Sequence, residues 1–174
     1  MRIANHKQFK DLIKKKRFWL CLDNIRSAYN VGAMFRTADG TGEWGILLIG
    51  ISPTPDNIRV AKTALGAQNY VPWGKIDSVT YFLDFIIKNK FENSLWSLEM
   101  LSPAENIFDI SYSDIPQPLF LTVGNEVLGV DAEILTFSRK HIFIPMHGFK
   151  ESLNVAESAS IAMYEFYRKL KYQD

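Results

Sequence analysis

The chain of 174 residues is 47% hydrophobic and 22% charged, with a formal net charge of +1 at pH 7. Its length and apolar content suit one domain with a sizeable core, and its ordinary share of charged residues excludes the disordered and fibrous classes. A net charge so close to zero gives no general attraction to polyanions, so any binding of nucleic acid has to come from a local patch of positive charge.

Short apolar runs alternate with amphipathic segments along the whole chain. Runs that are too brief for a helix and are bounded by polar residues are typical of buried strands. Asn30 is predicted to cap the first long helix, and Gly40 and Gly42 are predicted to end it. The predicted strands are residues 18–22, 45–49, 71–73, 91–98, 119–123 and 141–144. The predicted helices are residues 31–38, 57–65, 79–88, 130–137 and 155–169, after a short helical extension within residues 1–17.

The alternation of strands and helices predicts an α/β fold. Because the strands are almost continuously apolar, we expect a mostly parallel sheet with helices on both faces. No repeat, low-complexity tract or boundary interrupts the pattern, so residues 1–174 are expected to form a single domain. The last helix is predicted to bury one stripe of residues, namely Val155, Ala159, Ala162, Met163, Phe166 and Leu170.

The chain has one cysteine, Cys21, which lies in an apolar run. We interpret it as a small core residue in a reducing compartment. His6, His141 and His147 lack the spacing of metal ligands, so no metal site is expected. No apolar stretch approaches the roughly 18 residues that span a membrane, and the N-terminus lacks the apolar region of a signal peptide. We therefore expect a cytoplasmic protein without a membrane partner.

The first segment that suits a binding site is NIRSAYNVGAMFRTADGTG, residues 24–42. The amide groups at the start of a helix capped by Asn30 favour an anion. Gly32 and Arg36 are four residues apart and share one helical face, so open space beside a guanidinium group would suit a phosphate. A solvent-exposed arginine on an amphipathic helix explains the same spacing equally well.

The second segment, TVGNEVLGV at residues 122–130, follows a predicted strand. In an open parallel sheet, ligands collect where strands end at their carboxyl edge. Gly124 permits the close approach of another backbone segment. Glu126 is suited either to bonding a ribose hydroxyl or to capping a neighbouring loop. A plain turn with a solvated glutamate is an equally good interpretation of this segment alone.

The third segment, IPMHGFKESLNVAESASIAM at residues 144–163, is poor in bulky side chains. Backbone groups around Ile144 and Met146 suit an adenine ring, although Pro145 removes one amide donor. Small residues in such a loop let backbone come close to a ligand or to another loop. A tight connection in which Ser152 caps the last helix fits the spacing equally well.

Taken together and in this order, the three segments resemble the three motifs of the SpoU/TrmH-type RNA ribose methyltransferases of the SPOUT superfamily. NVGAMFRTADGTG matches Asn-x-Gly followed by Arg-Thr-Ala, GNEVLGV matches Gly-x-Glu-x-x-Gly, and IPMHGFKESLNVAESA matches Ile-Pro-Met, Gly and Ser-Leu-Asn-Val. The resemblance runs from about Phe18 to Tyr167. Glu157 departs from it, because the family usually has a small or apolar residue there.

The resemblance implies an enzyme that transfers a methyl group from S-adenosylmethionine to a ribose 2′-hydroxyl of RNA. It favours tRNA over rRNA as the substrate, and it implies a homodimer. It also implies a deep C-terminal trefoil knot, in which the segment after the last strands passes through another loop and forms the cofactor site. Knots are very rare among protein folds, and neither composition nor periodicity predicts one.

The resemblance also assigns roles to residues. Arg36 corresponds to the catalytic arginine, supported by Asn30, while Glu126 and Asn154 organise the site and Ser152 lies near the transferred methyl group. Since an arginine with a pKa above about 12 is a poor base, Arg36 is expected either to take the hydroxyl proton or to hold the adjacent phosphate while that phosphate accepts it. Residues expected to contact the cofactor are Leu98, Glu99, Gly124, Asn125, Glu126, Gly129, Ile144, Met146, Ser152 and Leu153. Residues expected to contact RNA are Arg26, Arg36, Arg59 and Lys62.

Three alternative functions agree less well with the residues. A knotted enzyme that methylates a base nitrogen is disfavoured by the combination of Asn30 and Arg36 with Ser-Leu-Asn. An RNA-binding protein that keeps the fold without turnover is disfavoured because Arg36, Glu126 and Asn154 are all present. A nucleotide-binding oxidoreductase would need Gly-x-Gly-x-x-Gly after the first strand, and this motif is absent.

Overall fold

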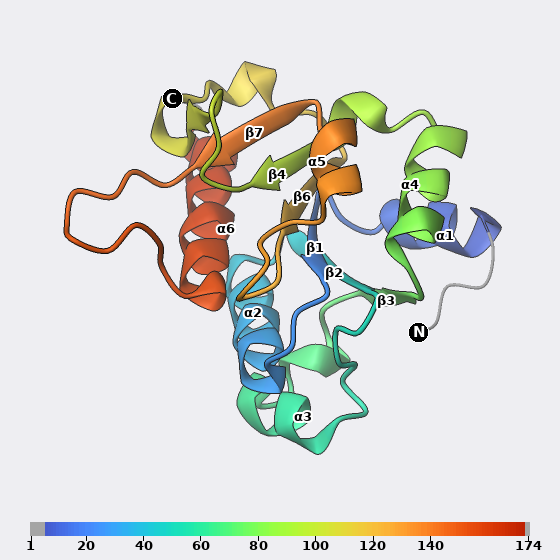
Figure 1. Ribbon diagram of the computed structural model, residues 1–174. Coiled ribbons are helices and arrows are strands. Elements are labelled where there is room, and N and C mark those ends of the chain that lie inside the picture. Colours follow the sequence, from blue (N-terminus) through green and yellow to red (C-terminus); the bar gives the residue numbers. More distant parts are fainter. Residues whose placement is uncertain (1–5, 173–174) are drawn as a thin grey trace.

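The apolar runs of the sequence form the centre of a seven-stranded sheet in the computed structural model, which describes residues 6–172 (Figure 1). Neighbouring strands pair in parallel throughout this sheet. In sheet order the strands are β3 (Trp73–Ile76), β2 (Trp44–Ile49), β1 (Phe18–Asp23), β6 (Leu119–Val123), β4 (Leu95–Leu98), β7 (Lys140–Phe143) and β5 (Glu105–Asn106).

Helices cover both faces of the sheet, as the sequence predicts. Successive side chains of a strand point to opposite faces, so Leu20 and Leu22 of β1 belong to one core cluster, and Trp19 and Cys21 to the other. One face packs against α2 (Ala28–Thr41), α3 (Ile58–Ala64) and α6 (Val155–Tyr172). The opposite face packs against α1 (His6–Ile13), α4 (Val79–Lys88) and α5 (Ala132–Phe137). Short 3-10 helices, named η1 to η4, span Ala67–Asn69, Glu92–Ser94, Ile107–Asp109 and Tyr112–Asp114.

Two strand predictions need correction, and one strand was not predicted. The predicted strand at 91–98 contains only β4, because the polar residues 92–94 form η2 outside the buried sheet. The predicted strand at 71–73 is displaced toward β3, which continues to Ile76. The two-residue strand β5 was not predicted, since so short a segment carries no recognisable periodicity.

The start of α2 differs from the prediction in a way that matters for the site. The helix begins at Ala28, and Ser27 caps it by accepting a hydrogen bond from the backbone N–H of Asn30 (3.3 Å). Asn30 therefore lies in the first helical turn, and its side chain is not used as a cap. At the other end, Gly40 lies within the helix, and Gly42 ends it in a left-handed conformation (φ +70°).

Gly32 does not leave open space beside Arg36, contrary to the prediction. A Cβ atom at Gly32 would lie 2.7 Å from the Cβ of Thr63 and 2.7 Å from the carbonyl oxygen of Val60. The glycine therefore allows α2 and α3 to pack closely. Arg36, four residues later, lies on the exposed surface of α2.

The last helix, α6, runs three residues beyond its predicted end. Asn154 rather than Ser152 caps its first turn, since the Asn154 Oδ1 accepts a hydrogen bond from the Ala156 N–H (2.8 Å). The buried stripe contains the predicted residues except Val155, which is half-buried. It also contains Ala156 and the ion pair of Glu165 with Lys169, which were not predicted. Glu157 is exposed in the first turn, where the helix dipole favours a negative charge. The trefoil knot stays a prediction.

Cys21 is fully buried in β1, as predicted, and burial raises the pKa of its thiol well above the ordinary value. Within residues 6–172, none of the helices combines the length and the apolar character that crossing a bilayer requires.

Candidate functional site

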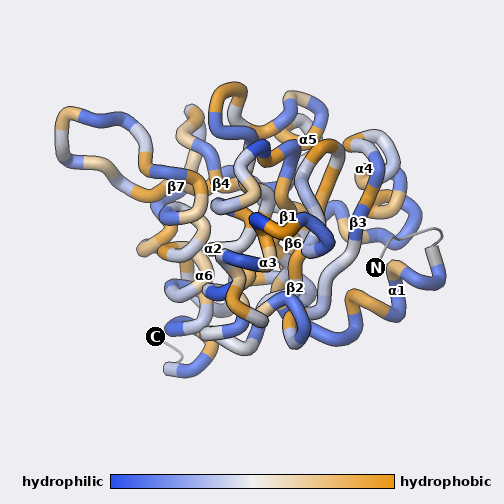
Figure 2. The backbone as a smooth tube through the Cα atoms, turned by 90° about the horizontal axis from the view of Figure 1, so that it is seen from below, coloured by the Kyte–Doolittle hydropathy of each residue, from blue (hydrophilic) through white to orange (hydrophobic). Residues whose placement is uncertain are grey.

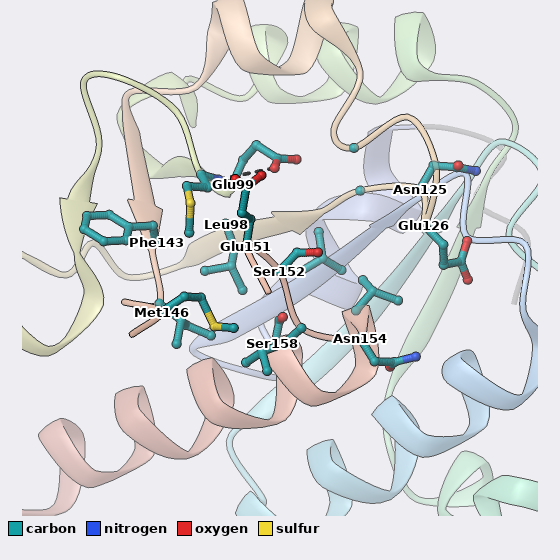
Figure 3. Close-up of a pocket in the computed structure, with 17 residues that line it drawn as sticks. Leu98, Glu99, Asn125, Glu126, Phe143, Met146, Glu151, Ser152, Asn154 and Ser158 are labelled. Carbon is teal, nitrogen blue, oxygen red and sulfur yellow. Dashed lines mark hydrogen bonds between the residues drawn. The ribbon is translucent and has the colours of Figure 1, made fainter. Parts of the chain in front are cut away.

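A cavity of about 410 Å³ opens where β4, β6 and β7 end at their carboxyl edge. This is the edge at which open parallel sheets bind ligands. Three connections border the cavity: the residues after Leu98, the loop at 124–130, and the loop at 145–153 that leads to α6 (Figure 3). The lining consists of Leu98, Glu99, Met100, Val123, Gly124, Asn125, Glu126, Gly129, Phe143, Ile144, Met146, Glu151, Ser152, Leu153, Asn154, Val155 and Ser158.

The fold brings all ten residues expected to contact a cofactor into this one lining. That they hold a cofactor stays a prediction. The lining residues that the sequence interpretation missed are Met100, Val123, Phe143, Glu151, Val155 and Ser158. Each is within four residues of a predicted one along the chain, so extending each motif by one helical turn would have found them.

The loop at 124–130 crosses its own base at very short range. The backbone groups of Asn125 and Gly129 exchange two hydrogen bonds of 2.9 Å each. A Cβ atom at Gly124 would lie 2.1 Å from the carbonyl carbon of Gly129 and 2.1 Å from the backbone nitrogen of Val130. Gly124 is therefore needed for the approach of backbone to backbone, and the space that it leaves is filled by its own loop rather than by the cavity.

Two side chains fix this loop to the rest of the sheet. Asn125 donates to the carbonyl oxygen of Asn24 (2.7 Å) and accepts from the N–H groups of Val127 and Leu128. The carboxylate of Glu99, after β4, accepts from the N–H of Val130 (3.1 Å). The loop is consequently anchored on both of its sides.

The backbone of Glu99 is less available to a ligand than expected. Its N–H donates to the carbonyl oxygen of Ile142 (3.0 Å), and its carbonyl oxygen accepts from the N–H of Leu101 (3.1 Å). The contribution of Glu99 to the cavity is therefore mainly its carboxylate and the loop that this carboxylate holds.

Glu126 connects this loop to the start of α2. Its carboxylate accepts hydrogen bonds from the N–H groups of Arg26 (3.0 Å) and Ser27 (3.1 Å) and from the side-chain amide of Asn30 (3.0 Å). Burial tends to raise the pKa of Glu126, but the amide donors of Arg26 and Ser27, with the side chain of Asn30, outweigh it and lower the pKa. Of the two roles open for Glu126, capping a neighbouring loop is the one its hydrogen bonds confirm.

Asn154 extends the same network to α6. Its side-chain nitrogen donates to the Oδ1 of Asn30 over 3.4 Å, while its Oδ1 caps α6. Figure 3 shows Glu126 and Asn154 pointing toward the start of α2 at one side of the cavity. Three motifs that are far apart in sequence thus meet at one point. We call Asn30, Glu126 and Asn154 the amide–carboxylate triad.

The loop at 145–153 differs sharply from the loop at 124–130. Among the residues that the structure describes, none forms a hydrogen bond with residues 145–153, whose groups along the cavity are left free. Ser152 is exposed, and a Cβ atom at Gly148 would have no atom within 4 Å. The expectation that small residues of this loop let another loop come close is therefore not met at Gly148. Figures 1 and 2 show this connection between β7 and α6 extending away from the body of the molecule.

The predicted RNA-contacting residues do not form one cluster. Arg26 and Arg59 line a second hollow of about 370 Å³ between the starts of α2 and α3. Lys62 is exposed on the next turn of α3. Arg36 is exposed six residues after Asn30, about 9 Å along the helix axis, and it does not line the cavity. Arg36 forms no hydrogen bond or ion pair with any residue from 6 to 172.

The charged side chains of the cavity lining are all acidic. Glu99, Glu126 and Glu151 contribute three carboxylates, and the lining contains no lysine or arginine. Such a lining favours a ligand that carries positive charge. No group of three or more histidine, cysteine, aspartate or glutamate side chains is arranged to hold a metal ion within the described part of the chain.

Several proteins of known type resemble this chain in sequence and in fold. YacO of Bacillus subtilis, named as a TrmH family tRNA/rRNA methyltransferase, is 30% identical over 157 residues, which cover 87% of this chain and 59% of YacO. The SpoU methyltransferase AviRb of Streptomyces viridochromogenes, crystallised with its cofactor AdoMet, has the same fold with a TM-score of 0.77 at 24% identity. The match to AviRb covers 89% of this chain and 61% of that one.

The TrmH/SpoU tRNA modifying enzyme of A. aeolicus is closer in length, because the match covers 95% of this chain and 84% of that one. Its TM-score is 0.75 at 25% identity. By contrast, the chain spans 59% of the length of the curated relatives from Staphylococcus saprophyticus and B. subtilis. A family model described as the SpoU rRNA Methylase family matches residues 17–164. The chain belongs to this family.

Proposed function

We propose that this chain transfers a methyl group from S-adenosylmethionine to a ribose 2′-hydroxyl of RNA. The observation that carries the proposal is the amide–carboxylate triad at the side of an acidic cavity. The triad joins the first, second and third motifs of the family at the carboxyl edge of a parallel sheet. Membership of the family supports the same reaction class.

The cavity fits this cofactor in size and in charge. Its volume lies within the roughly 300–1,000 Å³ typical of small-molecule sites. S-adenosylmethionine carries a sulfonium and an ammonium group, both of which suit a lining with three carboxylates and no basic side chain. Backbone groups of Met146 and Leu153 have no partner among residues 6–172 and are free to bond the adenine and the amino-acid part. Other residues proposed to hold the cofactor are Leu98, Glu99, Gly124, Asn125, Gly129, Ile144 and Ser152.

When bound, the cofactor supplies a methyl group that is activated by its sulfonium charge. The protein mainly has to position the hydroxyl and remove its proton. Arg36 is proposed to bind the RNA phosphate next to the target ribose while that phosphate accepts the hydroxyl proton, since a guanidinium group binds phosphate in a planar, two-point geometry. Asn30 and Asn154 are proposed as positioning residues, because both side chains are already engaged in the triad.

The proposed substrate is tRNA, with rRNA as the second candidate. The A. aeolicus relative, which is described as modifying tRNA, supports tRNA because this chain covers most of its length. The description of the family favours rRNA. The RNA is proposed to contact Arg26, Arg36, Arg59 and Lys62, and the cytoplasm remains the proposed compartment.

A homodimer is part of the proposal. The exposed side of α6 carries an aromatic hollow of about 460 Å³, which is the kind of surface that a second copy would cover. Light scattering is expected to give twice the 20.0 kDa mass of one chain at micromolar concentration. A particle of the single-chain mass would contradict the dimer. The hollow is lined by Phe108, Ile161, Tyr164, Glu165, Tyr167, Arg168 and Tyr172.

Two measurements test the function. Calorimetry with S-adenosylhomocysteine is expected to show one saturable site per chain. Transfer of labelled methyl groups to unmodified total tRNA and rRNA, followed by digestion to nucleosides, is expected to yield a 2′-O-methylated nucleoside. A methylated base would instead support the alternative knotted enzyme, and binding without any transfer would support the non-enzymatic alternative.

The Arg36→Ala substitution tests the catalytic assignment. We expect it to keep the affinity for S-adenosylhomocysteine, because Arg36 does not line the cavity. Methyl transfer is expected to fall by roughly 10²- to 10⁴-fold, the effect of losing acid–base assistance. Arg36→Lys should be almost as defective, since a point charge does not reproduce the planar guanidinium. Normal turnover in Arg36→Ala would identify Arg36 as an ordinary surface arginine.

A further inference from the structure

The second hollow, between the starts of α2 and α3, combines features that suit one nucleotide. Its volume is about 370 Å³. Its only charged lining residues are Arg26 and Arg59, whose side chains form no hydrogen bond or ion pair with any residue from 6 to 172. Tyr29 also lines the hollow and is 57% exposed. We call this the Arg26–Arg59 hollow. The remaining lining residues are Ser27, Ala28, Ile51, Pro53 and Asn57.

The walls of this hollow are fixed in place. Ser52, buried behind it, donates to the carbonyl oxygen of Leu22 (2.8 Å) and accepts from the N–H of Ile25 (2.9 Å). The N–H of Ile51 donates to the side chain of Asn24 (3.0 Å). These bonds tie the connection after β2 to the end of β1. The hollow is therefore preformed, which lowers the entropy cost of binding a ligand.

One hydrogen bond joins the lining of this hollow to the lining of the cavity. Ser27 lines the hollow, and its N–H donates to the carboxylate of Glu126, which lines the cavity. A chain of nucleotides whose ribose lies at the triad would therefore pass close to the Arg26–Arg59 hollow. Asp56 precedes Asn57 in the chain but does not line the hollow. Its carboxylate accepts a hydrogen bond from the Thr54 hydroxyl.

We propose that the Arg26–Arg59 hollow binds a nucleotide next to the one whose ribose is methylated. Arg26 and Arg59 bind its phosphate, and the ring of Tyr29 stacks on its base. The assignment of this nucleotide as a neighbour of the methylated one rests on the proposed function. Stacking on an aromatic ring tolerates any base, so the hollow supplies affinity and positioning rather than base identity.

The test measures the binding of a short fluorescein-labelled oligouridine by anisotropy over a series of salt concentrations. Tyr29→Ala is expected to weaken binding by about 5- to 150-fold, the range for the loss of one stacked base. Tyr29→Phe keeps the ring and is expected to keep the affinity. Arg26→Ala and Arg59→Ala are expected to lower the slope of log affinity against log salt by about 0.7 for each phosphate of the single strand that the variant no longer neutralises. Tyr29→Ala should leave that slope unchanged.

Matched controls exist at the opposite, amino edge of the sheet. Tyr70→Ala and Arg139→Ala replace exposed residues of the same types that precede β3 and β7, and both are expected to bind like the wild type. Thermal unfolding and calorimetry with S-adenosylhomocysteine report whether each variant is folded. Absence of oligouridine binding by the wild type would overturn the inference. So would unchanged affinity in Tyr29→Ala, or the same loss in the controls.

A second assay separates this inference from the proposed function. In methyl transfer to unmodified tRNA, Tyr29→Ala and Arg59→Ala are expected to raise the KM for RNA while kcat stays near the wild-type value. A wild-type protein that binds oligouridine through Tyr29 but transfers no methyl group would overturn the proposed function, while the hollow would stand as an RNA-binding site.

Discussion

The two loops that border the cavity are built in opposite ways. The loop at 124–130 is fixed by backbone bonds across its base, by Asn125 and by the carboxylates of Glu99 and Glu126. The loop at 145–153 has no hydrogen bond to any residue of the described range 6–172, although it borders the same cavity. The cavity therefore has one wall that hydrogen bonds hold in place, which we call the fixed wall, and one wall without such bonds to the described residues, which we call the adjustable wall.

This difference has an energetic meaning. Fixing the backbone of a residue costs roughly 1–2 kcal/mol of conformational entropy, and the first loop meets that cost during folding. We expect the second loop to be ordered at the expense of binding energy, since ligand-binding loops commonly belong to the least stable parts of a protein. Three substitutions and one hydrogen-exchange measurement test this contrast between the two loops.

The largest effect is expected from adding one methyl group to the fixed wall. Gly124→Ala places a Cβ atom 2.1 Å from the backbone of Gly129 and Val130, where nothing is able to yield without opening the loop. We expect a loss of about 3 kcal/mol in the free energy of unfolding, at the upper end for overpacking, together with loss of S-adenosylhomocysteine binding. Urea unfolding and calorimetry measure the two effects. A Gly124→Ala variant as stable as the wild type would contradict the rigidity of this loop.

Ligand-dependent hydrogen exchange tests the adjustable wall. Without a ligand, the amides of residues 146–153 are expected to exchange freely, since they have no acceptor in the described part of the chain. With S-adenosylhomocysteine at about 100 times its Kd, they are expected to gain up to about 2.7 kcal/mol of protection. The amide of Gly129, bonded to Asn125, should be protected in both states. Equal exchange of residues 146–153 with and without ligand would refute the contrast.

A smaller effect is expected at Glu126, which links the fixed wall to α2. Glu126→Gln should cost about 1 kcal/mol at pH 7, a modest value because this carboxylate is exposed and screened by solvent. Since the folded-state pKa of Glu126 is lowered, its contribution is present above the unfolded pKa of about 4.3 and is lost as the pH falls through the folded pKa. Urea unfolding from neutral to acidic pH should therefore show the variant converging on the wild type. A difference that grows in acid would contradict this sign.

The smallest effect is expected from Gly148→Ala, the counterpart of Gly124→Ala in the adjustable wall. A Cβ atom at Gly148 meets nothing within 4 Å, so stability should change by no more than about 0.5 kcal/mol. Urea unfolding of the two alanine variants side by side gives the contrast directly. Similar losses in both would show that the two loops are equally constrained.

The sequence predicted the parts of the molecule that depend on local patterns. The strands at 18–22, 45–49 and 119–123 and the helix at 79–88 agree with the structure because each has a clear apolar pattern between polar ends. The parallel sheet with two covered faces followed from their alternation. Residues 92–94 were misassigned, because the predicted strand was extended from the apolar residues at Leu95 and Trp96 back to Phe91, across three polar residues that have no strand pattern of their own.

The site was predictable only as a set of loops. The motifs located the cavity lining, but the contacts that organise it join residues about 100 positions apart, and no local pattern encodes them. The capping role of Glu126 was one of two open interpretations, and only its partners distinguish them. The close packing of Gly32 against Thr63 could not be predicted from the sequence either, because it depends on how α2 and α3 pack against each other.

Glu126 bonds to residues that lie far from it in the sequence, which affects the order in which a newly synthesised chain forms its site. Glu126 is 100 residues downstream of Arg26, and its carboxylate accepts a hydrogen bond from the backbone N–H of Arg26. At roughly 5–20 residues per second, synthesis takes about 5 to 20 s to cover that interval. During this time the carboxylate that accepts from the amides of Arg26 and Ser27 in the folded protein has not yet been made. A chain interrupted just before residue 126 would contain the first motif and the strands β1 to β6, yet the Glu126 bonds to that motif would still be missing.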